Sequence, residues 1–429
     1  MVSILLDDPL EKETWDVIVI GGGPSGCASA SILAQRGWKV LILEKDHFPR
    51  YHVGESLIPY CWFPLKRIGI LDKIKESNFT SKNSVQFVTP QGKASKPFYF
   101  FEHIEHDCAQ TWQVSRSDFD QLLLDHAKQS GAVVKHGTTV HGLIREQGLV
   151  QGVEAKTEAG GRSHYRARIT IDASGRSMLS AAGLGWRKQD PCLKKIAIWS
   201  YFKGAQRNEG LSAGATTIAS LPQQGWFWYI PLADDNVSIG VVAERSYLFA
   251  DSRNIEEIYM REIKRQPWIF SHTQSAERIS DCQVTNDYSY RSEYCAADGL
   301  ILTGDAFAFL DPMFSSGVFL ALQSAVMAAD AVDVALTKNE LGGEQFQAYG
   351  QELCEGIERM RKLIYAFYTE GFSFAELLRT HPEVHGDLTD CLVGNLWKSF
   401  DSLFAAISEQ CELPASLPHG RTPLHAVRR

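Results

Sequence analysis

The residues best suited to chemistry begin with a glycine-rich loop near the N-terminus, Gly21-Gly-Gly-Pro-Ser-Gly26. Its glycines have the spacing that a dinucleotide pyrophosphate needs, because a tight turn, a close backbone approach and a close helix contact each exclude a side chain. The helix after the loop would offer free N–H groups and the positive end of its dipole to the phosphates. We therefore predict that Gly21, Gly23, Pro24, Ser25 and Gly26 bind a dinucleotide.

A strand and a helix have to flank this loop if it binds phosphate. The β-branched run 15–20 precedes the loop, and the small residues of 27–35 suit a helix packed closely on that strand. A second apolar run, 38–43, ends at Glu44, 18 positions beyond the last glycine of the loop, where a carboxylate can accept hydrogen bonds from ribose hydroxyls. Glu44 and its neighbour Lys45 are therefore predicted cofactor ligands in a doubly wound α/β sheet.

Two later segments favour FAD over NAD, because they resemble nucleotide-contacting motifs of FAD-dependent monooxygenase-like proteins. The first runs from Asp172 through Gly175 to Arg176 after an apolar strand, and the second is a Gly-Asp pair ending at Asp305. In that superfamily the aspartate of the pair binds the ribitol chain, which NAD lacks. Arg116 resembles an arginine that reaches the cofactor's phosphate or ribityl region, although a surface arginine at a helix start remains the alternative.

An aromatic hexapeptide, Trp226-Phe-Trp-Tyr-Ile-Pro231, lies further along the chain. Taken by itself, its pattern predicts a buried strand, because alternate side chains of a strand point to opposite faces. Trp226, Trp228 and Ile230 would share one face, and Pro231 would lie on the other.

With this hexapeptide, the chain from about 15 to 336 resembles the flavin-dependent halogenases, in particular the compact members that act on phenol, pyrrole or carrier-bound substrates. The W-x-W-x-I-P of the hexapeptide is one signature of that family. A second is F-x-x-P-x-x-S-x-G at Phe309, Pro312, Ser315 and Gly317. The third is a lysine after the first helical block, and spacing alone selects Lys82 over Lys73, Lys93 and Lys96, which we expect to be solvated.

The resemblance implies a division of roles among these residues. Reduced FAD would add oxygen at C4a, and the resulting hydroperoxide would oxidise chloride or bromide to hypohalous acid. Lys82 would receive that acid across a tunnel and direct it to an electron-rich aromatic, because partial desolvation lowers the pKa of a lysine and makes it nucleophilic. The remaining implied roles are cofactor binding by Arg50, Gly54, Glu55, Ser56, Pro312 and Gly317, halide binding by Ser315, Ser316 and Gly317, and flavin shielding by Trp226, Trp228, Ile230, Pro231 and Phe309.

The composition of the chain excludes several classes of protein. The 429 residues carry a net charge of -8, which argues against a nucleic-acid groove. Nine cysteines without a C-x-x-C pair argue against a disulfide scaffold or a zinc site, so we expect no metal. The N-terminal residues lack the apolar run of a signal peptide, and the apolar stretch 318–336 is broken by polar residues, so we expect a cytoplasmic protein without a membrane span.

The expected organisation is a glutathione-reductase-like Rossmann fold for FAD, with a mixed substrate-side sheet and a helical C-terminal region. Residues 1–116 and 299–342 would form the FAD-binding module, 117–298 would contribute partly to it (including 169–176) and partly to the substrate-side sheet, and 343–429 would be helical. Strands at 133–136, 152–156 and 195–202 are assigned to the substrate-side sheet.

Two other functions remain open at this stage. One is a monooxygenase or saturating reductase of the same fold, because the nucleotide motifs are common to all of these enzymes. The other is a flavin-binding protein without turnover. The chain has a single dinucleotide loop, so we expect reduced FAD to come from a separate flavin reductase. The substrate would be a small aromatic, either free or tethered to an acyl or peptidyl carrier protein.

Overall fold

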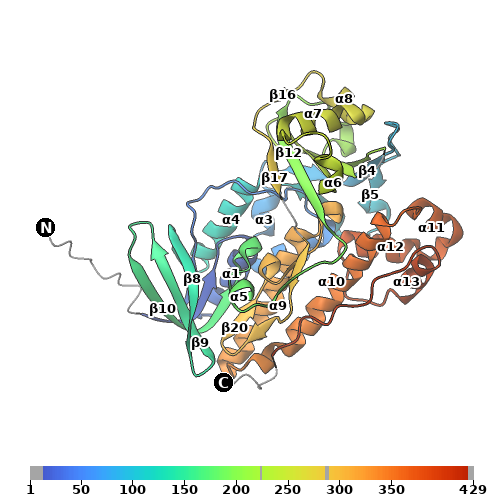
Figure 1. Ribbon diagram of the computed structural model, residues 1–429. Helices are drawn as coiled ribbons and strands as arrows, with labels where there is room; N and C mark the ends of the chain where they lie inside the picture. The colour runs from blue at the N-terminus through green and yellow to red at the C-terminus, as the bar shows by residue number, and fades with distance from the viewer. Residues whose placement is uncertain (1–12, 223–224, 286–288, 424–429) are drawn as a thin grey trace.

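A largely parallel sheet carries the glycine loop at the end of its first strand. The computed structural model describes residues 13–222, 225–285 and 289–423 (Figure 1). The strand order is β19-β20-β10-β1-β2-β7, with β8 and β9 extending from β10. The strands are β1 (Thr14–Ile20), β2 (Val40–Leu43), β7 (Val133–Lys135), β8 (Thr138–Glu146), β9 (Leu149–Thr157), β10 (Arg162–Asp172), β19 (Ala296–Ala297) and β20 (Leu300–Leu302). The ends of β1, β2 and β10 are almost wholly buried and apolar, as strands covered on both faces require.

Helices from distant parts of the sequence pack together on this sheet. Helix α1 (Pro24–Gln35) contacts both α4 (Arg116–Gln129) and α9 (Gly317–Lys338). Small residues in α1 permit the close approach, and most of its length is buried. These contacts confirm the predicted α/β fold and place the chain segments near 20, 116 and 317 close to one another.

A second, mostly antiparallel sheet lies beside the first, in the order β16-β12-β15-β14-β13-β4-β5 with β17 on β12 (Figure 1). Its strands are β4 (Ser84–Val88), β5 (Phe98–Tyr99), β12 (Lys195–Lys203), β13 (Thr216–Ser220), β14 (Trp226–Pro231), β15 (Asn236–Glu244), β16 (Glu277–Arg278) and β17 (Gln283–Thr285). Helices α6 (Arg245–Leu248), α7 (Ile255–Arg265) and α8 (Pro267–Thr273) accompany it. Phe227 and Tyr229 share an apolar cluster with residues of α7 and α8, so the opposite face of β14 is free to line the site.

Two of the three strands assigned to the substrate-side sheet belong elsewhere. β7 pairs in parallel with β2, and β9 pairs with β10, so both extend the first sheet. Conversely, β4 and β5, which lie within 1–116, join the second sheet. Short strands with similar alternation do not reveal their partners, because pairing is decided by contacts between residues far apart in the sequence.

The C-terminal region is helical, as predicted, and packs along α9 (Figure 1). It contains α10 (Gln347–Tyr368), α11 (Phe374–Thr380), α12 (His385–Val393) and α13 (Asp401–Ser408). The smaller elements are α2 (Trp62–Ile68), α3 (Leu71–Lys75), α5 (Leu179–Gly183), β3 (Thr80–Lys82), β6 (Thr111–Gln113), β11 (Arg187–Gln189), β18 (Tyr290–Ser292) and β21 (Ala308–Phe309). Within the described residues, α9 alone has the length and hydropathy to cross a bilayer, and most of its apolar stretch is buried in the core.

Candidate active site

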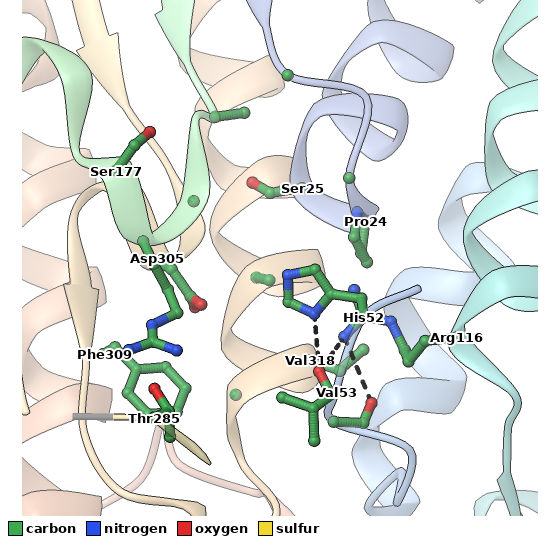
Figure 2. A pocket seen from close by; sticks show the side chains of 18 of the residues that line it. Pro24, Ser25, His52, Val53, Arg116, Ser177, Thr285, Asp305, Phe309 and Val318 are labelled. Carbon is green, nitrogen blue, oxygen red and sulfur yellow. Dashed lines mark hydrogen bonds between the residues drawn. The ribbon is translucent and has the colours of Figure 1, made fainter. Parts of the chain in front are cut away.

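A cavity of about 680 Å³ lies between the two sheets and collects most of the predicted site residues. In Figure 2, Asp305 and Phe309 lie across it from His52 and Arg116. The predicted residues that line it are Gly21, Gly23, Pro24, Ser25, Glu44, Lys45, Arg50, Gly54, Glu55, Ser56, Arg116, Gly175, Trp226, Trp228, Ile230, Asp305, Phe309, Pro312, Ser315 and Gly317. The predicted residues that do not line it are Gly26, Lys82, Asp172, Pro231 and Ser316.

The glycine loop leaves open space at one end of the cavity. A Cβ on Gly26 would lie 2.0 Å from the carbonyl oxygen of Gly21, so this glycine is needed for helix and strand to pack. A Cβ on Gly23 would meet a single heavy atom of the described residues within 4 Å, a guanidinium nitrogen of Arg50 at 3.6 Å. Glu44 Oε2 accepts a 2.6 Å hydrogen bond from the amide of Gly22, which holds the loop against the second strand. The N-terminus of α1 therefore faces an open space beside Arg50 that suits a pyrophosphate.

Arg116 is an interior residue, so its alternative as a surface arginine is wrong. Its guanidinium donates to both carboxylate oxygens of Asp120, at 2.8 and 3.0 Å, and to the carbonyl oxygen of Val53 at 2.8 Å. Asp305 lies across the cavity (Figure 2). Burial raises the pKa of Asp305 to about 6, although the charges of Arg116 and Arg176 favour its ionised form. This polar section has the hydroxyl-binding groups that a ribitol chain would use.

Asp172 acts on its own loop and does not reach the cavity. Its carboxylate accepts hydrogen bonds from the amides of Ser174, at 2.9 Å, and Ser180, at 2.7 Å. These bonds shape the turn that brings Gly175 to the cavity wall. Asp172 therefore acts on the cavity through the turn that carries Gly175. Its direct contact with the cofactor stays a prediction.

The aromatic hexapeptide forms one wall of the cavity, and its alternation is as predicted. Trp226, Trp228 and Ile230 line the cavity, whereas Pro231 lies on the opposite face of β14. Gly240 on the neighbouring strand makes room for the wall, because a Cβ there would lie 2.2 Å from the Trp228 ring. The wall is therefore continuous and apolar beside the polar section.

The segment predicted to hold a halide is a tight turn that leads into α9. Ser315 adopts a left-handed conformation with φ of 53°, and its amide donates to the carbonyl oxygen of Pro312 at 3.0 Å. A Cβ on Gly317 would approach the Phe309 ring to 3.1 Å, so the glycine accommodates this ring. The first amides of a helix have no partner within the helix, which leaves those of Ser316 and Gly317 as the better anion donors.

Lys82, the last residue of β3, is buried, although a lysine is ordinarily solvated. Its Nζ donates to Ser56 Oγ at 2.8 Å and to the carbonyl oxygen of Leu57 at 2.9 Å. It lies 5.7 Å from the centre of the Phe100 ring. Burial lowers the pKa of Lys82 from 10.5 to about 7. Since Ser56 lines the cavity, one hydroxyl separates this amine from the cavity, while Lys93 and Lys96 are exposed.

Two further residues complete the site, although no local pattern predicts that they lie beside Lys82. Thr216 lines the cavity, and its hydroxyl lies 2.8 Å from that of Ser56. Gln113 donates to Thr216 Oγ1 at 2.8 Å and to the carbonyl oxygen of Gly214 at 2.9 Å. These polar residues stand in strands whose partners are remote in sequence, so only the fold brings them to Lys82. In the described part of the chain, no group of three or more His, Cys, Asp or Glu side chains could hold a metal.

Burying Lys82 has an expected cost that depends on pH. Because its pKa is 10.5 when exposed and about 7 when folded, the unfolded chain binds more protons between these values. The free energy of unfolding should therefore fall as the pH decreases through this window and stay level below it. Lys82→Met should remove this dependence. As the pH is lowered from 10 to 7, the free energy of unfolding of the variant should therefore rise relative to that of the native protein by on the order of a few kcal/mol. Denaturant titration at several pH values measures the difference, and a constant gap would show that Lys82 is not desolvated.

Known proteins resemble this chain over most of its length. The family model described as "FAD binding domain" matches residues 14–353. A 1H-pyrrole-2-carbonyl-(peptidyl-carrier protein) chlorinase of Pseudomonas fluorescens is 30% identical, covering 90% of this chain and 91% of that protein. The corresponding brominase of Pseudoalteromonas luteoviolacea is 34% identical, covering 77% and 80%. The structure of the flavin-dependent brominase Bmp2 superposes with a TM-score of 0.84 at 28% identity, covering 92% of this chain and 99% of that one.

The fold and the cavity, with the family match, define an FAD-dependent flavoprotein. Within that class, the chain belongs to the flavin-dependent halogenases, which are oxidoreductases. Its reaction is therefore FAD-dependent halogenation, and the alternatives of a monooxygenase, a saturating reductase and a flavin-binding protein without turnover are set aside.

Proposed function

We propose that this enzyme halogenates an electron-rich aromatic ring through Lys82. The observation that carries the proposal is the buried amine of Lys82, which is hydrogen-bonded to a hydroxyl of the cavity wall. Bound reduced FAD supplies the oxygen chemistry that oxidises a halide to hypohalous acid. With a pKa near 7, Lys82 is partly neutral at neutral pH, so it can hold that acid by hydrogen bonding or accept the halogen.

The other residues of the cavity separate the steps of this reaction. The amide of Gly317, which lines the cavity at the start of α9, holds the halide there, because the helix dipole favours an anion. Trp226 and Trp228 fill the wall beside it, so a small anion passes where an organic ring does not. The substrate would therefore meet the oxidant beyond the cavity, on the Lys82 side of Ser56. The polar section with Arg116, Asp305 and the glycine loop holds the cofactor.

The substrate we propose is a pyrrole carried as a thioester on a peptidyl carrier protein. Two relatives with extensive coverage are named for halogenating that compound, one with chlorine and one with bromine. A pyrrole is electron-rich, as attack on an electrophilic halogen requires. We further propose that a separate flavin reductase delivers the reduced FAD and that the protein acts in the cytoplasm.

A substrate panel tests this function. Purified protein with FAD, a flavin reductase, NADH and chloride or bromide is given the pyrrole thioester on its carrier, the free pyrrole acid and simple phenols. Mass spectrometry should show halogen incorporation, greatest for the carrier-bound pyrrole, and none without the reductase. Efficient halogenation of free phenols but not of the thioester would refute the substrate proposal. Hydroxylation in place of halogenation would refute the proposed chemistry.

A further inference from the structure

A chain of hydrogen bonds connects the solvent to a buried carboxylate in the cavity wall. Glu55 lines the cavity and is 2% exposed, and the hydroxyl of Tyr201 on β12 donates to its Oε1. The hydroxyl oxygens of Tyr201 and Tyr51 lie 3.2 Å apart. Tyr51 lines the same cavity and is 54% exposed, so the chain begins at an open part of the cavity that water can reach.

While Glu55 is ionised, the phenol protons of this chain can be ordered toward its carboxylate. A phenol has one proton, and that of Tyr201 is directed to Glu55. Tyr51 must therefore donate to the Tyr201 oxygen. The indole Nε1 of Trp199 donates to the Tyr51 oxygen at 2.6 Å, which fixes that hydroxyl in place. Each hydroxyl thus points its proton toward the cavity.

The reaction needs a proton at this place. Forming hypohalous acid and water from a halide ion, dioxygen and reduced FAD takes up one proton per turnover. Transfer of the halogen from hypohalous acid to an arene releases water and takes up no further proton. The indoles of Trp199 and Trp228 also line the cavity and supply no acid, whereas the charges of Arg116 and Arg176 favour the ionised form of Asp305, another carboxyl of the wall.

We propose that Tyr51, Tyr201 and Glu55 form the proton entry path of this enzyme, an inference that rests on the proposed function. The Glu55 carboxyl releases a proton to an oxygen atom that leaves as hypohalous acid or water. Glu55 takes a proton from Tyr201, Tyr201 takes one from Tyr51, and Tyr51 takes one from solvent. The net result is one proton moved from solvent into the cavity, with each phenol restored.

The groups around Glu55 allow its carboxyl both to release and to take up a proton. Burial raises the pKa of the Glu55 carboxyl, while hydrogen bonds from Tyr201 and Ser238 and the charge of Arg116 lower it. The protonated form is therefore accessible, and its conjugate base is stabilised. Removing the Tyr201 hydroxyl should raise the pKa of Glu55 further, because the carboxylate loses a donor.

Infrared spectroscopy of the protein without FAD tests the first link. The carboxylic-acid band that disappears in Glu55→Gln reports the protonation of Glu55 as the pH is changed. We expect Tyr201→Phe to move that protonation to higher pH and Tyr51→Phe to leave it nearly in place. An unchanged titration in Tyr201→Phe would overturn the path, whatever reaction the enzyme catalyses.

Rates of halogenation test the transfer itself. Tyr51→Phe should slow product formation roughly 10-fold and increase the solvent deuterium isotope effect, and a small buffer such as imidazole should restore the rate. Glu55→Gln should be slowed by roughly 10²-fold or more and should not be rescued. Because Tyr51 lines the cavity, the rates of Tyr51→Phe are compared at saturating FAD.

A matched control exists outside the cavity. Tyr247 on α6 donates to Glu262 at 2.9 Å, so Tyr247→Phe removes the same kind of bond without touching the path. It should retain the native rate and isotope effect. Native rates and isotope effects in both Tyr51→Phe and Glu55→Gln would overturn the proton path while leaving the halogenase function standing. A native enzyme without halogenation would instead refute the proposed function, and the infrared titration would still decide whether the hydrogen-bonded chain exists.

Discussion

Replacing Lys82 with alanine is expected to abolish halogenated product while reduced FAD is still consumed with oxygen. The amine is hydrogen-bonded to Ser56 on the cavity wall, so its removal leaves the glycine loop and the polar section intact. Product formation should fall by on the order of 10²-fold or more, because the oxidant is no longer positioned beside the substrate. Stopped-flow absorbance follows the flavin, and mass spectrometry follows the product.

The neighbouring lysines supply controls for that result. Lys93 and Lys96 are exposed, and Lys73 bonds to Gln129 on the surface, so alanine at each should leave the rate nearly unchanged. A small, freely diffusing arene should still trap hypohalous acid released by Lys82→Ala. If Lys82→Ala kept the native rate with the proposed substrate, Lys82 would lose its catalytic role.

Two glycines of the same loop should respond in different ways to a side chain. Valine at Gly23 should weaken FAD binding by about 10- to 100-fold and leave the stability of the protein without FAD unchanged. Its backbone is extended, and among the described residues only Arg50 comes within 4 Å of the position that a Cβ would take. Overpacking of about 1–3 kcal/mol would therefore be felt only when the cofactor is present. Fluorescence titration with FAD measures the affinity.

The matched change at Gly26 should act on the protein itself. A Cβ there would lie 2.0 Å from the Gly21 carbonyl oxygen, so even Gly26→Ala should lower the free energy of unfolding by about 3 kcal/mol. Thermal unfolding without FAD separates the two variants. If Gly23→Val bound FAD as tightly as the native protein, the pyrophosphate would not lie at this loop.

The parts of the site that follow from local sequence could be predicted. A strand, a glycine turn and a helix are neighbours in the chain, and Glu44 follows the next strand. The arrangement of this nucleotide-binding motif therefore follows from adjacent residues alone. The alternation of Trp226, Trp228 and Ile230 likewise places them on one face without knowledge of the partner strands. Burial of these side chains then follows from their apolar character.

The parts that depend on distant contacts could not be predicted. Gln113 reaches Thr216 across 103 positions, and Trp199 reaches Tyr51 across 148. Strand pairing decides these contacts, and the same cause misplaced β7 and β9. The resemblance of the chain to the halogenases predicts Lys82 by its spacing. Its lowered pKa follows from burial, which only the folded chain supplies.

One phenol at the end of α10 joins three distant segments of the chain. The indole Nε1 of Trp226 donates to the hydroxyl of Tyr368 at 2.9 Å, and that hydroxyl donates to Asp311 at 3.2 Å. Asp311 in turn accepts from the amide of Met313, at the start of the turn before α9. Exchanging the C-terminal helices would therefore also disturb the Trp226 side of the cavity wall and the turn before α9. An exchange that keeps Tyr368 would preserve both hydrogen bonds and leave the cavity wall and the turn in place.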